Sequence, residues 1–250
     1  MNVLAIHLDV LISVKVLKKY WGVDPQSIVH VGAHNAEELE TYNQAGWGPV
    51  IWIEAQPSKV RELSNRLPRS HRLIEAAVWD VDDIDLNLNV MTNTESTSLL
   101  SLGTHAKEHP TVTFSHTIPV KTKTLKNLLN NFEIPELLAL DIQGVELRAI
   151  KGYGSEIASV KWVYCEVNKA ELYEGCCLIS EIDEYLSQYG FSRAVTRWTI
   201  HNWGDALYEN RNLVPRSNLS QKISRSVVKI SWAFDSTISK LKKLARRFLN

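Results

Sequence analysis

The sequence predicts an α/β fold of the Rossmann-like, doubly wound type, with a mostly parallel sheet covered by helices on both faces. Short apolar runs rich in β-branched residues alternate with amphipathic segments of about ten residues, as βαβ units require. Several runs end at a glycine or an acid, at the edge of the sheet where such folds bind ligands. The last two runs follow one another without a helix between them, which indicates a C-terminal antiparallel hairpin.

Apolar periodicity and chain breakers define the individual elements. The amphipathic stretch Leu8–Tyr20 predicts an N-terminal helix. The predicted strands are Ser27–Val31, Val50–Ile53, His71–Val78, Leu86–Val90, Ile118–Lys121, Leu137–Ile142, Val160–Val167, Phe191–Arg197 and Ala206–Glu209. The predicted helices between them are Ala36–Ala45, Ser58–Leu67, Thr124–Asn131, Gly144–Lys151 and Leu178–Tyr189. The stretch Met91–His116 has no clear period, and we expect a long loop, a feature that usually serves function in a compact domain.

The net charge of zero conceals an acidic body and a basic tail. Residues 215–250 contain nine Lys or Arg and one Asp, so the tail carries +8 and the rest of the chain −8. Apolar residues recur along the tail in steps of three and four. The chain thus divides into an N-terminal helical extension (1–26), a main domain (27–212) and a basic amphipathic helical tail (213–250). The tail can contact an anionic membrane surface, the acidic body or a second subunit, as in a homodimer.

Composition excludes several classes of protein. An acidic body does not suit a nucleic-acid partner, because phosphate binding needs a concentrated positive face. The three cysteines, Cys165, Cys176 and Cys177, have neither the spacing of a zinc site nor that of a disulfide framework. Charges interrupt the apolar stretch Val3–Leu17, which is unlike a signal peptide or membrane span. We therefore expect a cytoplasmic protein, with the tail offering peripheral contact at the inner face of the membrane.

Two strand ends predict a binding crevice. Gly32 closes the first strand and opens a helix, where unpaired N–H groups face a ligand, although packing alone also explains such a glycine. Glu54 ends the next strand about twenty residues later, where an acid binds the ribose of an adenosine cofactor. Nicotinamide cofactors usually require several glycines in the first turn, and here only Gly32 is present. This argues against a dehydrogenase.

A third strand end adds a second acid to the same edge. Asp141 follows the strongly apolar run that begins at Leu137, so it should face the crevice beside Glu54. Asp141 can instead cap the following helix. Glu146 lies within that helix and can brace the loop. The carboxylates from Asp80 to Asp83 fit a solvated turn better than a magnesium site, and we expect no metal.

These motifs resemble those of the FkbM-type methyltransferases, a branch of the class I S-adenosylmethionine-dependent enzymes, over about Ser27 to Tyr208. The matching segments are His30–Glu37, Glu54–Pro57, Ala77–Asp80, Ser96–Leu100, Asp141–Glu146 and Ile150–Gly152. The resemblance implies a class I methyltransferase fold with a seven-stranded, mostly parallel sheet. The sequence departs from the family pattern in the opening motif, where His30 replaces an aspartate, His34 an asparagine and Ala36 a glycine.

The resemblance also implies S-adenosyl-L-methionine as cofactor and a set of residues that bind it. Glu54 would hold the ribose, Ala77, Val78 and Asp80 would lie beside the adenine, and Gly32 and Asp141 would flank the methionine moiety. The complete expected set is Gly32, Ala33, His34, Glu54, Ala55, Ala77, Val78, Asp80, Asp141 and Gln143.

Methyl transfer to oxygen requires a group that aligns the acceptor and removes its proton. The candidate bases are Asp141, His105, His109 and Glu166, the last at the end of a buried strand. The late aromatic residues suit the apolar face of a sugar, although core packing explains them equally well. We expect an O-methyltransferase for a sugar hydroxyl of a glycan or of a small-molecule metabolite. The alternative is a binding protein that keeps the fold without catalysis.

Overall fold

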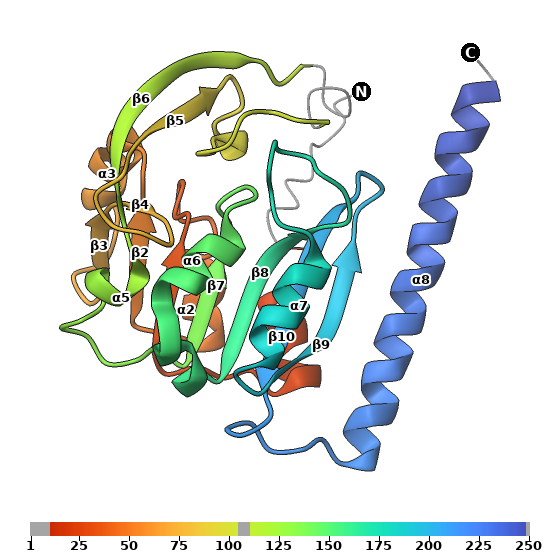
Figure 1. Ribbon diagram of the computed structural model, residues 1–250. Helices are drawn as coiled ribbons and strands as arrows, with labels where there is room; N and C mark the ends of the chain where they lie inside the picture. Colours follow the sequence, from red (N-terminus) through yellow and green to blue (C-terminus); the bar gives the residue numbers. More distant parts are fainter. Residues whose placement is uncertain (1–10, 105–110, 249–250) are drawn as a thin grey trace.

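The computed structural model describes residues 11–104 and 111–248, and its centre is a seven-stranded sheet (Figure 1). The strands are β1 (Ile28–Val31), β2 (Val50–Glu54), β3 (Arg72–Glu75), β7 (Leu137–Leu140), β8 (Trp162–Asn168), β9 (Phe191–Trp198) and β10 (Trp203–Asn210). Their order is β3-β2-β1-β7-β8-β10-β9. The first five are parallel, and β10 is antiparallel to both β8 and β9. The predicted Rossmann-like class I methyltransferase fold, with its C-terminal hairpin, is confirmed.

Helical segments cover both faces of this sheet. On one face lie α5 (Leu125–Leu128), α6 (Glu146–Tyr153), the 3-10 helix η3 (Gly154–Ser159) and α7 (Ile179–Ser187). On the other lie α1 (Val14–Val16), the π-helix η1 (Leu17–Trp21), α2 (Leu39–Ala45) and α3 (Pro57–Ser64). Each face has its own hydrophobic core, since alternate residues of a strand point to opposite faces.

A second, three-stranded sheet was not predicted. It consists of β4 (Ala77–Val78), β5 (Asp85–Met91) and β6 (Phe114–Lys123), in the order β4-β6-β5. The prediction of one strand over His71–Val78 was therefore wrong, because the chain leaves the main sheet after Ala76 donates to the Glu54 carbonyl and β4 then pairs with β6. β5 and β6 extend over the end of the main sheet (Figure 1). The 3-10 helix η2 (Thr94–Ser96) follows β5.

The two ends of the chain differ from the prediction in extent. Helical structure near the N-terminus runs from Val14 to Trp21, so the predicted helix over Leu8–Tyr20 begins too early within the described residues, and residues 8–10 lie outside them. The tail forms one long helix, α8 (Leu219–Phe248), beside β9 (Figure 1). Among the described residues, no helix combines the length and apolar character needed to cross a membrane.

Candidate active site

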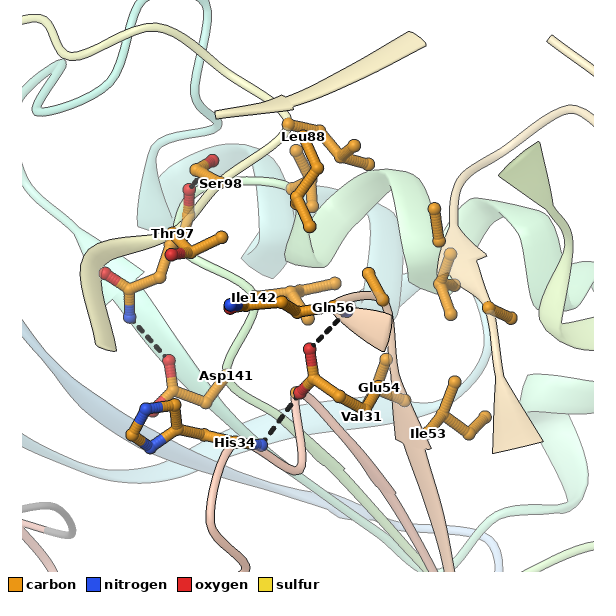
Figure 2. A pocket seen from close by; sticks show the side chains of 18 of the residues that line it. Val31, His34, Ile53, Glu54, Gln56, Leu88, Thr97, Ser98, Asp141 and Ile142 are labelled. Carbon is orange, nitrogen blue, oxygen red and sulfur yellow. Dashed lines mark hydrogen bonds between the residues drawn. The ribbon is translucent and has the colours of Figure 1, made fainter. Parts of the chain in front are cut away.

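A cavity open to solvent lies at the carboxyl ends of β1, β2 and β7 (Figure 2). The second sheet and η2 supply its other wall. Its lining residues are Val31, Gly32, His34, Ile53, Glu54, Ala55, Gln56, Ala76, Ala77, Val78, Leu88, Thr94, Glu95, Thr97, Ser98, Leu99, Asp141, Ile142, Gln143 and Val145. We call this cavity the cleft.

Glu54 joins the loops that follow β1 and β2. Its carboxylate accepts the backbone N–H of His34 at 2.8 Å through Oε2 and that of Gln56 at 2.7 Å through Oε1 (Figure 2). Each carboxylate oxygen has a second lone pair, so two further hydrogen bonds can be accepted from the cleft. Glu54 therefore fixes the shape of the cleft floor and still offers acceptors to a pair of hydroxyls.

Gly32 allows β1 and β7 to approach one another closely. Its φ is +90°, and a Cβ at this position would overlap the backbone carbonyl of Asp141. The glycine is thus required by the contact between two strand ends, which is the packing explanation left open by the sequence. The same close approach places the Asp141 side chain at the edge of the cleft.

His34 connects the first loop to η2 across the cleft. Its Nδ1 lies 2.8 Å from the Glu37 carboxylate and its Nε2 lies 2.8 Å from the Thr94 hydroxyl. Burial opposes protonation, but the hydrogen bond with Glu37 raises the pKa of His34 overall. The same contact lowers the pKa of Glu37 to about 2, despite burial that opposes this change. His34 therefore holds the segment around Thr94 against the first loop.

Gln143 links the two candidate bases. Its Nε2 donates to Asp141 Oδ1 at 2.6 Å and to Glu166 Oε2 at 3.1 Å. Its Oε1 accepts the Tyr173 hydroxyl at 2.6 Å, and its backbone carbonyl accepts Ser98 Oγ at 2.8 Å. The φ of Gln143 is +55°, a conformation that few L residues adopt. Because every polar group of this side chain is bound, Gln143 keeps the two carboxylates at fixed positions.

Glu146 braces the loop from Asp141 to the start of α6. Its side chain is fully buried and accepts the backbone N–H of Ile142 at 3.1 Å and that of Gly144 at 3.1 and 3.2 Å. Burial and the nearby charge of Asp141 raise its pKa to about 7. Glu146 thus positions the loop that carries Asp141 and Gln143.

A second cavity meets the cleft at Asp141. It lies against the other face of β7 and β8, roofed by α1, η1 and α2. Its lining residues are Val14, Leu17, His30, Glu38, Tyr42, Trp47, Leu137, Ala139, Leu140, Asp141, Tyr164, Glu166 and Asp205. Asp141 is the residue that lines both cavities, so any chemistry at their junction occurs beside its carboxylate.

The carboxyl groups of the second cavity hold their protons unusually strongly. Desolvation by the surrounding protein raises the pKa of Asp141 to about 6 against the hydrogen bond from Gln143, although the residue is exposed to solvent, and the charge of Glu38 adds to the rise. Burial raises the pKa of Asp205 to about 7. The pKa of Glu166 is raised well above its usual range, again by burial and by the charge of Asp141. All three carboxyl groups therefore bind their protons more tightly than carboxyl groups in water do.

A comparison with known protein families identifies the family to which this chain belongs. The model of the methyltransferase FkbM domain matches residues 30–193, more than half of the chain. The chain belongs to the FkbM methyltransferase family. It is accordingly an S-adenosylmethionine-dependent methyltransferase. None of the curated proteins matches the sequence.

Solved structures of other methyltransferases are similar to this FkbM methyltransferase at low identity. Precorrin-6y C5,15-methyltransferase from Geobacter metallireducens is 15% identical with a TM-score of 0.41, covering 78% of this chain and 87% of that chain. Magnesium protoporphyrin IX methyltransferase from Synechocystis, with bound SAM, is 10% identical with a TM-score of 0.40, covering 75% and 71%. The 1,6-didemethyltoxoflavin-N1-methyltransferase from Burkholderia thailandensis, with bound S-adenosylhomocysteine, is 9% identical with a TM-score of 0.43, covering 78% and 75%.

The cleft of this FkbM methyltransferase suits the cofactor on its own chemistry. It offers the free acceptor positions of Glu54 for ribose hydroxyls and small apolar walls at Ala77 and Val78 for an adenine ring. At the opposite side, the Asp141 carboxylate can attract the α-ammonium or the sulfonium of the methionine moiety. The hydrogen-bond acceptors, the apolar wall and the negative charge of the cleft thus fit S-adenosylmethionine.

Eight of the ten expected cofactor residues line the cleft: Gly32, His34, Glu54, Ala55, Ala77, Val78, Asp141 and Gln143. Two do not. Ala33 is fully buried beneath the loop, and Asp80 forms an ion pair of 2.9 Å with Arg148 outside the lining. Cofactor contact by each residue remains a prediction.

The candidate bases fall in different places. Asp141 and Glu166 are brought together through Gln143. His105 and His109 lie outside the described residues. No group of three or more His, Cys, Asp or Glu within the described part of the chain has a geometry suited to a metal ion.

His30 does not face the cofactor, although it occupies the family's aspartate position. It is buried on the other face of β1, where its Nδ1 lies 3.1 Å from the Tyr42 hydroxyl and its ring packs on Trp52. Burial lowers its pKa to about 4, so the ring is neutral. His30 is therefore not a lining residue of the cleft, and its replacement of the family's aspartate does not alter that lining.

Sequence reasoning missed the wall of the cleft formed by the second sheet. Leu88, Thr94, Thr97, Ser98 and Leu99 all line it. The serine-rich segment Ser96–Leu100 carried the signal, because it matches a family motif. The role of this segment was not assigned, because a local sequence pattern does not show which part of the fold a loop will contact.

Proposed function

We propose that the chain is an O-methyltransferase that modifies a hydroxyl of a sugar, in a glycan or in a glycosylated metabolite. The observation that carries the proposal is the second cavity, which shares Asp141 with the cleft as a lining residue. An acceptor in the second cavity and a cofactor in the cleft would meet beside that group.

Both Asp141 and Glu166 have raised pKa values. A general base is most effective when its pKa lies near the working pH, and the pKa of Asp141, raised to about 6, meets this condition. The raised pKa of Glu166 favours its protonated form, which can donate a hydrogen bond to an acceptor oxygen. Asp141 is thus the general base of the proposal and Glu166 a positioning residue.

The lining of the second cavity suits a polyhydroxylated acceptor. Glu38, Asp205 and Tyr164 supply polar groups, while Tyr42 and Trp47 supply aromatic surface. Sugars combine hydroxyls with apolar ring faces, so they match a mixed lining of this kind.

When bound, S-adenosylmethionine supplies an electrophilic methyl group on a sulfonium. The residues of the chain then have three tasks: Glu54 holds the ribose, Gln143 fixes the two carboxyl groups, and Asp141 takes the proton of the acceptor hydroxyl. Orientation and proton removal are the contributions that an enzyme makes to such a displacement.

The test supplies the protein with isotopically labelled S-adenosylmethionine and a cell glycan extract, and locates the label by mass spectrometry. We expect label on a sugar oxygen, with activity falling below about pH 6 as Asp141 becomes protonated. Label on nitrogen or carbon would refute the O-methyl proposal. Saturable cofactor binding without transfer to any extract would favour the non-catalytic alternative.

Two matched amide variants separate the roles. Asp141→Asn removes the base and should lower the transfer rate by roughly a hundredfold or more. Glu166→Gln keeps an acceptor for the Gln143 amide and should have a much smaller effect. Equal rates for the two variants would contradict the assignment of the base.

A further inference from the structure

The long C-terminal helix α8 has two faces with different surroundings. Arg225 donates to the backbone carbonyl of Tyr20 at 2.8 Å and of Trp21 at 3.1 Å, and Lys229 donates to that of Ala194 at 2.7 Å. The ring of Trp232 stacks on that of Trp21. These residues recur at steps of three and four, so one face of α8 is fixed on η1 and β9.

The apolar face of α8 points away from the body. Leu219, Ile223, Val227 and Ile230 are 74, 58, 60 and 56% exposed, although each is a large hydrophobic residue. At about 100° per residue, their mean direction is roughly opposite to that of Arg225, Val228 and Trp232. In the sequence the same spacing continues through Phe234, Ile238, Leu241, Leu244 and Phe248. We call the four exposed positions Leu219, Ile223, Val227 and Ile230 the apolar stripe.

A basic cavity lies between the first part of α8 and the β9 edge, and Arg225 and Lys229 line it from the face of α8 that contacts the body. Its cationic lining residues are Arg193, Arg211, Arg216, Lys222, Arg225 and Lys229. Two carboxylates offset part of this charge: Glu209 pairs with Arg211 and Arg225, and Asp183 pairs with Arg193. Burial and the charge of Arg225 lower the pKa of Lys229. Within the described residues, the side chains of Arg216 and Lys222 make no ion pair with the body.

We propose that α8 binds the surface of an anionic membrane, with the apolar stripe at the acyl boundary and Arg216 and Lys222 near the lipid phosphates. An exposed amphipathic helix flanked by Lys and Arg has the character of an interfacial helix. Anionic lipids attract such residues because the charges are complementary. The proposal concerns where the enzyme acts and holds whether or not the acceptor is a sugar.

A second copy of the chain is the competing occupant of the stripe. Paired helices bury apolar residues at similar spacing, but their flanking positions carry charges of opposite sign that attract across the interface. Residues 215–250 contain nine Lys or Arg and a single acid, so two copies of α8 would place like charges together. The anionic membrane is therefore the better match.

Flotation of the full-length protein with lipid vesicles tests the proposal. We expect binding to vesicles of phosphatidylcholine mixed with phosphatidylglycerol, weak binding to phosphatidylcholine alone, and loss of binding at high salt. Equal binding to both vesicle types, or no binding to either, would overturn the proposal.

Two pairs of substitutions that change the net charge by the same amount test whether the apolar stripe contacts the membrane. Ile223→Glu with Ile230→Glu disrupts the apolar stripe and should weaken partitioning by roughly tenfold or more. Gln221→Glu with Ser231→Glu alters exposed positions outside the stripe and should weaken it much less. Equal losses for the two pairs would show that only net charge matters and would refute the inserted stripe.

A third variant and a measurement of mass complete the test. Arg216→Glu with Lys222→Glu should remove the preference for phosphatidylglycerol while leaving methyl-donor binding unchanged, because both residues are remote from the cleft. Light scattering gives the mass in solution. A dimer that the Ile223 and Ile230 substitutions dissociate, with no vesicle binding by the wild type, would assign the stripe to a second copy.

Discussion

Substituting Glu146 by glutamine should flatten the pH dependence of stability. Glu146 is fully buried, and its ordinary pKa of 4.5 is raised to about 7 by burial and by the charge of Asp141. Glutamine has the same shape, and its Oε1 can accept the N–H groups of Ile142 and Gly144 that Glu146 now binds. The substitution therefore removes the titrating charge and keeps the brace of the loop.

The magnitude follows from the difference between the two pKa values. At about 1.4 kcal/mol per pKa unit, the rise from 4.5 to about 7 corresponds to about 3 kcal/mol of folding free energy. The folded state holds the proton more strongly, so this contribution is complete below about pH 4.5 and is lost as the pH rises to about 7. The wild type should thus lose up to about 3 kcal/mol over this range that the variant retains.

Urea denaturation from about pH 4.5 to about pH 8 measures this difference. The free energy of unfolding of Glu146→Gln should decline less steeply than that of the wild type, and the two curves should separate as the pH rises. Glu146→Leu is the control, because it leaves two buried N–H groups unpaired and should destabilise the protein by about 1–3 kcal/mol per group at every pH.

Parallel curves for the wild type and Glu146→Gln would refute the reasoning, since they would mean that Glu146 titrates in the folded protein as it does in the unfolded chain. Asp141, Glu166 and Asp205 also have raised pKa values, so the wild-type slope alone cannot identify the group. The difference between the two proteins isolates Glu146.

Three further substitutions probe the cleft. Glu54→Ala removes the acceptors for a ribose and should weaken S-adenosylmethionine binding by roughly tenfold to a hundredfold. Calorimetric titration measures this affinity, and an unchanged value would place the ribose elsewhere. Gly32→Ala should prevent folding, because its Cβ would overlap the Asp141 carbonyl and φ is +90°; a soluble variant that melts near the wild-type temperature would contradict this. Tyr173→Phe frees one side of Gln143 and should lower the transfer rate by roughly tenfold with little change in cofactor affinity.

Much of the fold was predictable because the main strands are short apolar runs bounded by glycines and acids. β1, β2 and β7 were located to within two residues, and with them the edge of the sheet that carries Gly32, Glu54 and Asp141. The second sheet was not predictable. Alternating residues identify β5 and β6 as strands, but alternation does not say which sheet a strand joins.

The side-chain contacts of Gln143 could not be predicted from the sequence either. Glu166 was a candidate from its place at the end of a buried strand, and β8 does lie next to β7. Gln143 was expected to touch cofactor, whereas its amide also bridges Asp141 and Glu166 and accepts the Tyr173 hydroxyl. Its φ of +55° directs the side chain there, and no residue pattern encodes that choice.

Asp141 lines both cavities because it lies just beyond the end of a strand. Within β7, alternate side chains point to one face or the other, so Leu138 and Leu140 pack in one core and Leu137 in the other. At Asp141 the strand has ended, and the side chain borders both cavities. A carboxylate at a position within β7 would point to one face of the sheet only. The position after the last paired residue is therefore the one at which a single base can face a cofactor on one side and an acceptor on the other.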